Sequence, residues 1–234
     1  MMFTLARVDF ENPLLWAMLI GWVITVILHE FAHGVVAYWG GDYTIRERGG
    51  LTLNPLQYID PVMSIVLPVV ILAMGGIPLP GGSTYVRRDL LRSRAWDSAV
   101  SLAGPGMNLL LMLVCLVPLH PKFGWADPGN VAAWSNAQVF LGAMAVLQLM
   151  AALFNLVPIP PLDGFQAVAE FLPSRLTEKV GTPPLSTFIF FVYFMILWNS
   201  GVVTVVLVWF VRLLYMLGFG PGVVLAYGDA FWGR

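Results

Sequence analysis

The sequence predicts an all-α polytopic membrane protein of about five to six transmembrane helices, with a re-entrant segment and short membrane-associated β-strands. The chain has 234 residues, of which 59% are hydrophobic and only 11% are charged, and its mean hydropathy is +0.80. Soluble domains carry about 25% charged residues, and a bilayer crossing needs roughly 20 predominantly apolar residues. Because only short polar loops separate the apolar runs, we expect one integral membrane domain over residues 1–234, with a core at 14–172 and a C-terminal helical hairpin at 185–217.

Composition excludes several classes of protein. The net charge of -1 offers no basic surface for nucleic acid, so no nucleic-acid partner is expected. One cysteine, Cys115, excludes an internal disulfide and a thiolate zinc cluster. The oligomeric state is left open. We expect no cleavable signal peptide, because the first apolar run carries the motif described next and must be retained.

The first apolar run, from Leu14 to Trp39, is predicted to be a membrane helix that contains a His29-Glu30-x-x-His33 motif. Positions i and i+4 of a helix lie on one face, so both imidazoles could bind one metal ion. Glu30 sits one position round from His29, where its carboxylate could activate a water molecule. Ionisable side chains in hydrocarbon cost several kcal/mol each, and their presence indicates a functional site rather than packing.

The next part of the chain is expected to be less regular. Two short strands are predicted at Tyr43–Arg46 and Gly50–Asn54, where β-branched and aromatic residues stand between glycines. Residues 62–77 are apolar but too few for a straight crossing, which favours a tilted span or a re-entrant segment. Prolines and glycines between Ile77 and Val86 exclude a regular helix there, so we expect an extended segment.

Two further spans are predicted at 97–119 and 137–157. The second breaks at a proline-rich stretch that ends in Asp163-Gly164. Zinc in a hydrolytic site typically has three protein ligands and one open position, and Asp163 is the best candidate for the third ligand. Its alternative role is a helix N-cap.

Residues 185–217 contain no charge until Arg212. Asn199-Ser200-Gly201 is predicted to split this region into two short helices, and one kinked helix is the alternative.

Three motifs occur together on predicted membrane spans: His29-Glu30-x-x-His33, Ala103-Gly104-Pro105-x-x-Asn108, and Asn155-x-x-Pro158-x-Pro160-x-Leu162-Asp163-Gly164. In this order they make the chain resemble the site-2 protease family of intramembrane zinc metalloproteases, in its compact bacterial and archaeal form without PDZ or CBS domains. The resemblance implies one Zn²⁺ per chain, held by His29, His33 and Asp163, with Glu30 as the catalytic acid and base. It also implies a protease domain in the lipid bilayer that cuts membrane-anchored proteins in or near their transmembrane segments, as in regulated intramembrane proteolysis.

Asn108 and Asn155 are candidates for binding the substrate strand or the oxyanion, and interhelical hydrogen bonding is their alternative. Pro80, Tyr85 and Val86 are candidates for an extended segment to which an unwound substrate adds as a strand, and a plain loop is the alternative. The predicted strand at Gly50–Asn54 is a second candidate for the same role.

The distribution of basic residues predicts the orientation in the cell membrane. Arg87–Arg94 and Arg175–Lys179 are expected to be cytoplasmic and residues 120–136 external, which places the active site toward the cytoplasmic side. Residues 61–86 must then enter and leave the membrane on the same side.

Two other functions would use the same residues differently. In a zinc-binding membrane transporter the same ligands would line a permeation site, but transport needs no general base beside two histidines. An inactive protease-like scaffold would have no need for intact Glu30 and Asp163.

Overall fold

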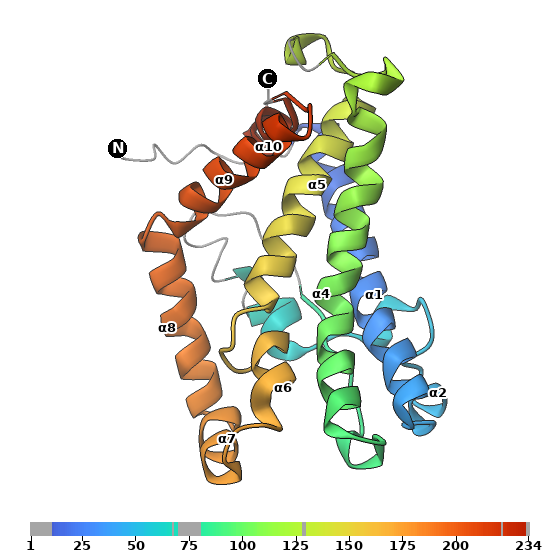
Figure 1. The fold of residues 1–234 in the computed structure, drawn as a ribbon, viewed down its shortest axis with the longest axis vertical. Helices are drawn as coiled ribbons and strands as arrows, with labels where there is room; N and C mark the ends of the chain where they lie inside the picture. The colour runs from blue at the N-terminus through green and yellow to red at the C-terminus, as the bar shows by residue number, and fades with distance from the viewer. Residues whose placement is uncertain (1–10, 67, 70–80, 128–129, 221, 233–234) are drawn as a thin grey trace.

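The computed structural model describes residues 11–66, 68–69, 81–127, 130–220 and 222–232, and in this part of the chain the structure is helical (Figure 1). Three long helices form the body of the molecule: α1 (Pro13–Gly40), α4 (Arg94–Leu116) and α5 (Asn136–Asn155). The central helix is α4, which packs against α1 on one side and against α5 on the other. Successive long helices run in opposite directions.

These three helices are long and apolar enough to cross a membrane, and they coincide within a few residues with the three spans predicted most directly. α7 (Ser174–Gly181) and α8 (Leu185–Asn199) meet at 73° and can be counted together as a fourth span. α9 (Val202–Met216) is an apolar helix of only 15 residues. The described residues therefore provide three or four candidate spans, fewer than the five to six predicted.

Local sequence signals explain where the helices begin and end. The Asn12 side chain accepts a hydrogen bond from the Leu14 N–H and caps α1, and Ser93 and Ser135 cap α4 and α5 in the same way. Gly201 has a φ of 72° and separates α8 from α9, which confirms the predicted split of this region.

The predicted β-strands are wrong, because no residue in the described part of the chain forms a strand. Tyr43–Arg46 largely forms a helical turn, α2 (Thr44–Glu47), in which Ile45 is fully buried and its carbonyl accepts the Gly50 N–H at 2.9 Å. Gly50–Asn54 forms turns, and Asn54 caps the short helix that follows. Strand propensity failed here because these residues pack individually against α1 and α2 and have no partner strand.

The chain between α1 and α4 leaves the bundle and returns to the same end of it. The Arg92 N–H donates to the Gly40 carbonyl at 2.9 Å, so the start of α4 lies beside the end of α1. This return agrees with the path that the basic residues require for 61–86, although residues 70–80 of that path lie outside the described residues.

The largest apolar cluster lies at the opposite end of the bundle, where the first turns of α1 meet α5, α9 and α10. Leu15, Met18, Met144 and Leu214 are almost completely buried there. The end of the bundle that holds α2 and α6 lies outside this cluster.

The remaining elements are η1 (Pro55–Gln57), η2 (Pro61–Val66), η3 (Arg88–Leu90), η4 (Val117–Leu119), η5 (Pro121–Phe123), η6 (Val131–Ala133), α6 (Asp163–Ala169) and α10 (Gly222–Trp232).

Candidate metal centre

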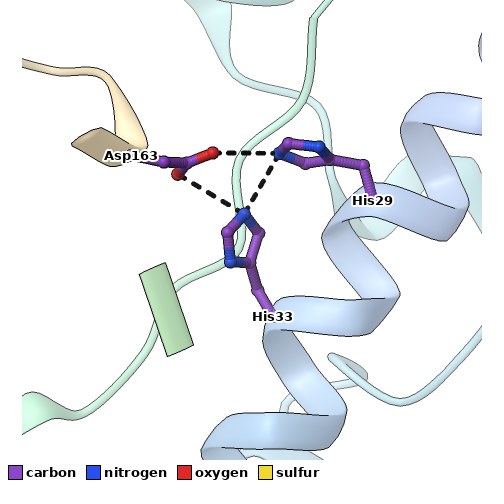
Figure 2. A group of neighbouring side chains, drawn as sticks. All are labelled: His29, His33 and Asp163. Atoms are coloured by element: carbon purple, nitrogen blue, oxygen red, sulfur yellow. Dashed lines mark hydrogen bonds and ion pairs between the residues drawn. The ribbon is translucent and has the colours of Figure 1, made fainter. Parts of the chain in front are cut away.

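His29 and His33 lie one turn apart on the buried face of α1, as their spacing predicts. Both side chains are buried, and the rings meet edge to face with their centroids 4.8 Å apart. Their Nε2 atoms are only 3.1 Å apart and point toward the same place (Figure 2).

Asp163 approaches this pair from the opposite side, at the first residue of α6 (Figure 2). Its Oδ2 lies 3.2 Å from Nε2 of His29, and its Oδ1 lies 3.4 Å from Nε2 of His33. The N-cap position of α6 belongs to Leu162, so the alternative role of Asp163 as the cap is not what the structure has. The next residue has to be glycine, because a Cβ on Gly164 would lie 2.2 Å from the Leu156 carbonyl oxygen.

The far side of each imidazole is tied to α4. Nδ1 of His29 lies 2.8 Å from Oδ1 of Asn108, and Nδ1 of His33 lies 2.6 Å from the carbonyl oxygen of Val100. Carbonyl oxygens only accept hydrogen bonds, so each Nδ1 carries the ring proton and donates it. In the neutral imidazole Nε2 then keeps its lone pair, and second partners of this kind orient histidines that bind metals.

The converging atoms fit a divalent cation. Two Nε2 lone pairs and a carboxylate, all acceptors, face one another at 3.1–3.4 Å, and Oδ2 of Asp163 is buried without a hydrogen-bond donor. A single proton would satisfy only one pair of these atoms. Ligand atoms bonded at about 2.0–2.1 Å around a tetrahedral ion lie about 3.3 Å apart, and two imidazoles with one carboxylate form a catalytic zinc set.

Gly104 leaves the room that such an ion needs. A Cβ at this position of α4 would lie 2.3 Å from Nε2 of His33 and 2.4 Å from Nε2 of His29. The small residues of the Ala103-Gly104-Pro105 motif thus bring the α4 backbone close to the two ligating atoms, and Asn108 follows one turn later on the same face.

Glu30 lies beside the cluster in a buried position, with 5% of its surface exposed. It contacts the segment 81–87: a Cβ on Gly82 would lie 3.0 Å from Cγ of Glu30, and the Thr84 hydroxyl donates to the Glu30 carbonyl at 3.1 Å. Burial and then the charge of Glu30 raise the pKa of the nearby Tyr58 phenol, which donates its proton to the Thr52 carbonyl.

The other predicted site residues lie at different places. Asn108 makes the interhelical hydrogen bond that was its alternative role. The Asn155 amide donates to Ala151 of its own helix at 3.1 Å, and no described contact joins it to the histidines. Tyr85 and Val86 belong to the segment 81–87 beside Glu30, whereas Pro80 lies outside the described residues.

The sequence analysis did not identify two groups that the structure places around this site, the Val100 carbonyl on His33 and the Asp42 carboxylate on the segment 81–87. The Val100 carbonyl is a main-chain atom, so no residue type signals its role. The buried Asp42, described below, follows Gly40-Gly41 at the end of the first span, and a charge at that place commonly indicates only the membrane boundary.

Comparison with known proteins decides the family. The chain is 39% identical over 201 residues to Rip2 of Mycolicibacterium smegmatis, named a zinc metalloprotease, across 83% of this chain and 70% of that protein. The chain belongs to peptidase family M50. The family model matches residues 120–199 of this M50 peptidase, a range that contains Asp163.

Two further relatives of this M50 peptidase also carry the name of a zinc metalloprotease. Rip2 of Mycobacterium tuberculosis is 40% identical over 152 residues, which are 65% of this chain and 56% of that protein. YwhC of Bacillus subtilis is 32% identical over 158 residues, which are 68% of this chain and 70% of that protein. No solved structure matches the chain. The predicted membership of the site-2 protease family is confirmed.

Proposed function

We propose that this M50 peptidase is an intramembrane zinc metalloendopeptidase that cuts membrane-anchored proteins in or near their transmembrane segments. The observation that carries the proposal is the convergence of His29, His33 and Asp163, because both imidazoles donate from Nδ1 and turn their Nε2 atoms toward a carboxylate whose Oδ2 is buried. One Zn²⁺ per chain would be held by these three residues. The names of the relatives support the choice of metal.

A zinc ion at this position supplies Lewis acidity, since it lowers the pKa of water and polarises a peptide carbonyl. Glu30 takes up the proton released by the attacking water and gives it to the leaving amine. Its position on the same helical turn as His29, and its burial from bulk solvent, keep the carboxylate next to the reacting atoms.

The substrate segment must be unwound before it is cut, because the carbonyls of a helix are hydrogen-bonded and shielded. The segment 81–87 is the candidate for holding it, since this segment runs past Glu30 without forming a helix. An unwound substrate would add to it as a strand. This docking explains how a membrane-embedded peptide bond could be brought to a buried carboxylate.

The proposed orientation places the metal centre toward the cytoplasmic side. Four arginines precede or begin α4, and the Arg92 N–H donates to the carbonyl of Gly40 at the end of α1, so this basic cluster lies where α1 ends: Arg87, Arg88, Arg92 and Arg94. Basic residues concentrate on the cytoplasmic side of membranes. His33 lies in the second half of α1, near the same end of the bundle, and Asp163 lies 3.4 Å from it.

The decisive experiment compares the wild type with Glu30→Gln on a fluorogenic transmembrane peptide in detergent micelles, with zinc content measured for both. We expect cleavage by the wild type, a loss of about 100- to 10,000-fold in the variant, and equal zinc content. Equal cleavage by both proteins would refute the role of Glu30. Zinc flux into liposomes without cleavage would instead favour a transporter, and zinc binding with neither activity would favour a scaffold.

A further inference from the structure

The segment 81–87 has the side-chain pattern of an extended strand. Ser83, Tyr85 and Arg87 are exposed, whereas Thr84 and Val86 between them are partly buried. Val86 packs against the small apolar cluster of Ala37, Ile45 and Val100, which fixes the inner face of the segment. Side chains that alternate in this way belong to a chain with a period of two.

One main-chain edge of this segment is already occupied. The Ser83 N–H donates to the Tyr58 carbonyl at 2.9 Å, the Tyr85 carbonyl accepts from Nη1 of Arg48 at 3.2 Å, and the Arg87 N–H donates to Oδ2 of Asp42 at 2.8 Å. In an extended chain the groups of every second residue point to the same edge. The Tyr58 carbonyl, the Arg48 guanidinium and the Asp42 carboxylate thus make the hydrogen bonds that a neighbouring strand would make.

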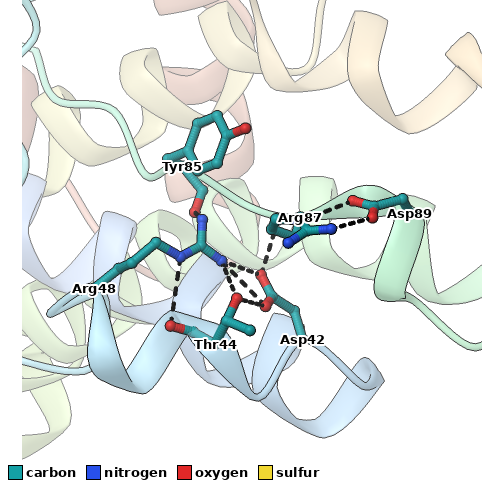
Figure 3. Close-up of polar contacts among 6 residues, drawn as sticks. All are labelled: Asp42, Thr44, Arg48, Tyr85, Arg87 and Asp89. Carbon is teal, nitrogen blue, oxygen red and sulfur yellow. Dashed lines mark hydrogen bonds and ion pairs between the residues drawn. The ribbon is translucent and has the colours of Figure 1, made fainter.

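Asp42 and Arg48 form the centre of this arrangement (Figure 3). The Asp42 side chain is completely buried, and its two oxygens accept from Nη2 of Arg48 at 3.1 and 2.9 Å and also from the Thr44 hydroxyl. The Arg48 guanidinium also lies 5.0 Å from the centre of the Tyr85 ring. A charge as buried as this one is costly unless every partner is in place, so the geometry is tightly fixed.

The opposite edge carries the main-chain groups of Thr84 and Val86. Among the residues that the structure describes, these groups make no hydrogen bond. This edge begins two residues after Gly82, which lies beside Glu30.

We propose that Asp42 and Arg48 are positioning residues of the peptidase: they hold the segment 81–87 at its occupied edge, so that the edge of Thr84 and Val86 is presented to the substrate beside Glu30. The inference rests on the proposed function, because it gives that function's docking segment a fixed register. Neither residue touches the reacting atoms. Their contribution is to order the segment before the substrate arrives.

The first test needs no substrate. Amide hydrogen exchange of the peptide that covers residues 83–88 is measured in the zinc-loaded protein for the wild type, Asp42→Asn and Arg48→Ala. We expect exchange about tenfold faster in both variants, with unchanged exchange in the peptide that contains His29 and His33. Arg48 is one-third exposed, so its replacement tests the idea even if the Asp42 variant fails to fold.

The second test separates KM from kcat on the fluorogenic transmembrane peptide. In both variants we expect KM to rise about tenfold and kcat to stay within about twofold, because ordering of the segment then has to accompany binding. The matched control is Asp89→Asn, which removes the exposed ion pair of Asp89 with the Arg87 side chain on the same segment and leaves Asp42 untouched. We expect this control to behave like the wild type.

Unchanged exchange and unchanged KM in Arg48→Ala would overturn the proposal. A fall in kcat and in zinc content together with a rise in KM would also overturn it, because that result indicates a general structural role. If the wild type itself cleaves no transmembrane peptide, the proposed function fails, and hydrogen exchange still decides whether Asp42 and Arg48 order the segment.

Discussion

At the scale of single residues, the orientation of the two imidazoles is set by atoms that never touch the metal. The Val100 carbonyl and the Asn108 side chain each accept a hydrogen bond from an Nδ1 atom, and this tautomer leaves the Nε2 atoms of His29 and His33 available to the proposed ion. An imidazole with its proton on Nε2 would point a donor at the ion.

Replacement of Asn108 tests this orientation. Asn108→Ala removes the acceptor for the His29 proton, and we expect the affinity for zinc to fall about 10- to 100-fold, as is usual when such a partner is lost. Competition with a fluorescent zinc chelator measures the change. Asn108→Asp keeps an acceptor oxygen and should retain most of the affinity, so equal losses in the two variants would argue against a positioning role.

Gly104 offers a second test at this scale. The methyl group of Gly104→Ala would lie 2.3–2.4 Å from both Nε2 atoms, so we expect the zinc-loaded form to be lost. Gly106→Ala is the matched control, because no atom lies within 4 Å of a Cβ at that position of the same helix. Metal analysis after purification distinguishes them, and zinc retention by Gly104→Ala would contradict the placement of the ion.

At the scale of elements, α6 delivers the carboxylate. Its first turn is fixed by the close approach of Gly164 to the Leu156 carbonyl, and the Ser98 hydroxyl of α4 donates to the Ala167 carbonyl at 2.6 Å. The position of Asp163 therefore depends on two contacts outside the metal site.

Gly164→Ala is expected to displace α6. A Cβ there would lie 2.2 Å from a main-chain oxygen, which cannot move as a flexible side chain does. We expect weaker zinc binding and lost cleavage, with α-helical circular dichroism unchanged. Gly181→Ala places its methyl in ordinary contact with Phe165 and should behave as the wild type. Full zinc affinity in Gly164→Ala would show that Asp163 is positioned in another way.

The elements also show which features the sequence could predict. The boundaries of α1, α4 and α5 follow from apolar runs that end at capping residues, and the juxtaposition of His29 and His33 follows from helical spacing alone. Local propensity predicts strands around Ile45, because it does not contain the burial of Ile45 against Ala37 of α1 and Val100 of α4. The same limit applies to Asn108. From the sequence, its side chain could bind the substrate or the oxyanion, or form an interhelical hydrogen bond, and the choice depends on which residue faces it in the fold.

At the scale of the whole molecule, the largest apolar cluster and the candidate metal centre occupy opposite ends of the bundle. The large core joins the first half of α1 to α5 and α10, and the histidines of the candidate metal centre lie in the second half of α1. The outer faces of α8 and α9 carry exposed apolar side chains such as Phe188, Ile196 and Trp209, which suits contact with lipid.

Labelling of single cysteines tests the proposed orientation. In a Cys115→Ala background, we expect Lys122→Cys to react with a membrane-impermeant maleimide on intact cells and Thr52→Cys to react only after permeabilisation. Both positions are exposed in the structure, so access depends on sidedness alone. External labelling of Thr52→Cys in an active enzyme would reverse the orientation.

The wide separation of the three ligands along the chain has a consequence for biosynthesis. While the ribosome is still translating α4 and α5, the nascent chain contains His29 and His33 but does not yet contain Asp163. If these three residues hold the zinc ion as proposed, the complete site forms only after α6 has been synthesised and has folded against α4. The proposed hydrolytic activity would then begin only at a late stage of biosynthesis.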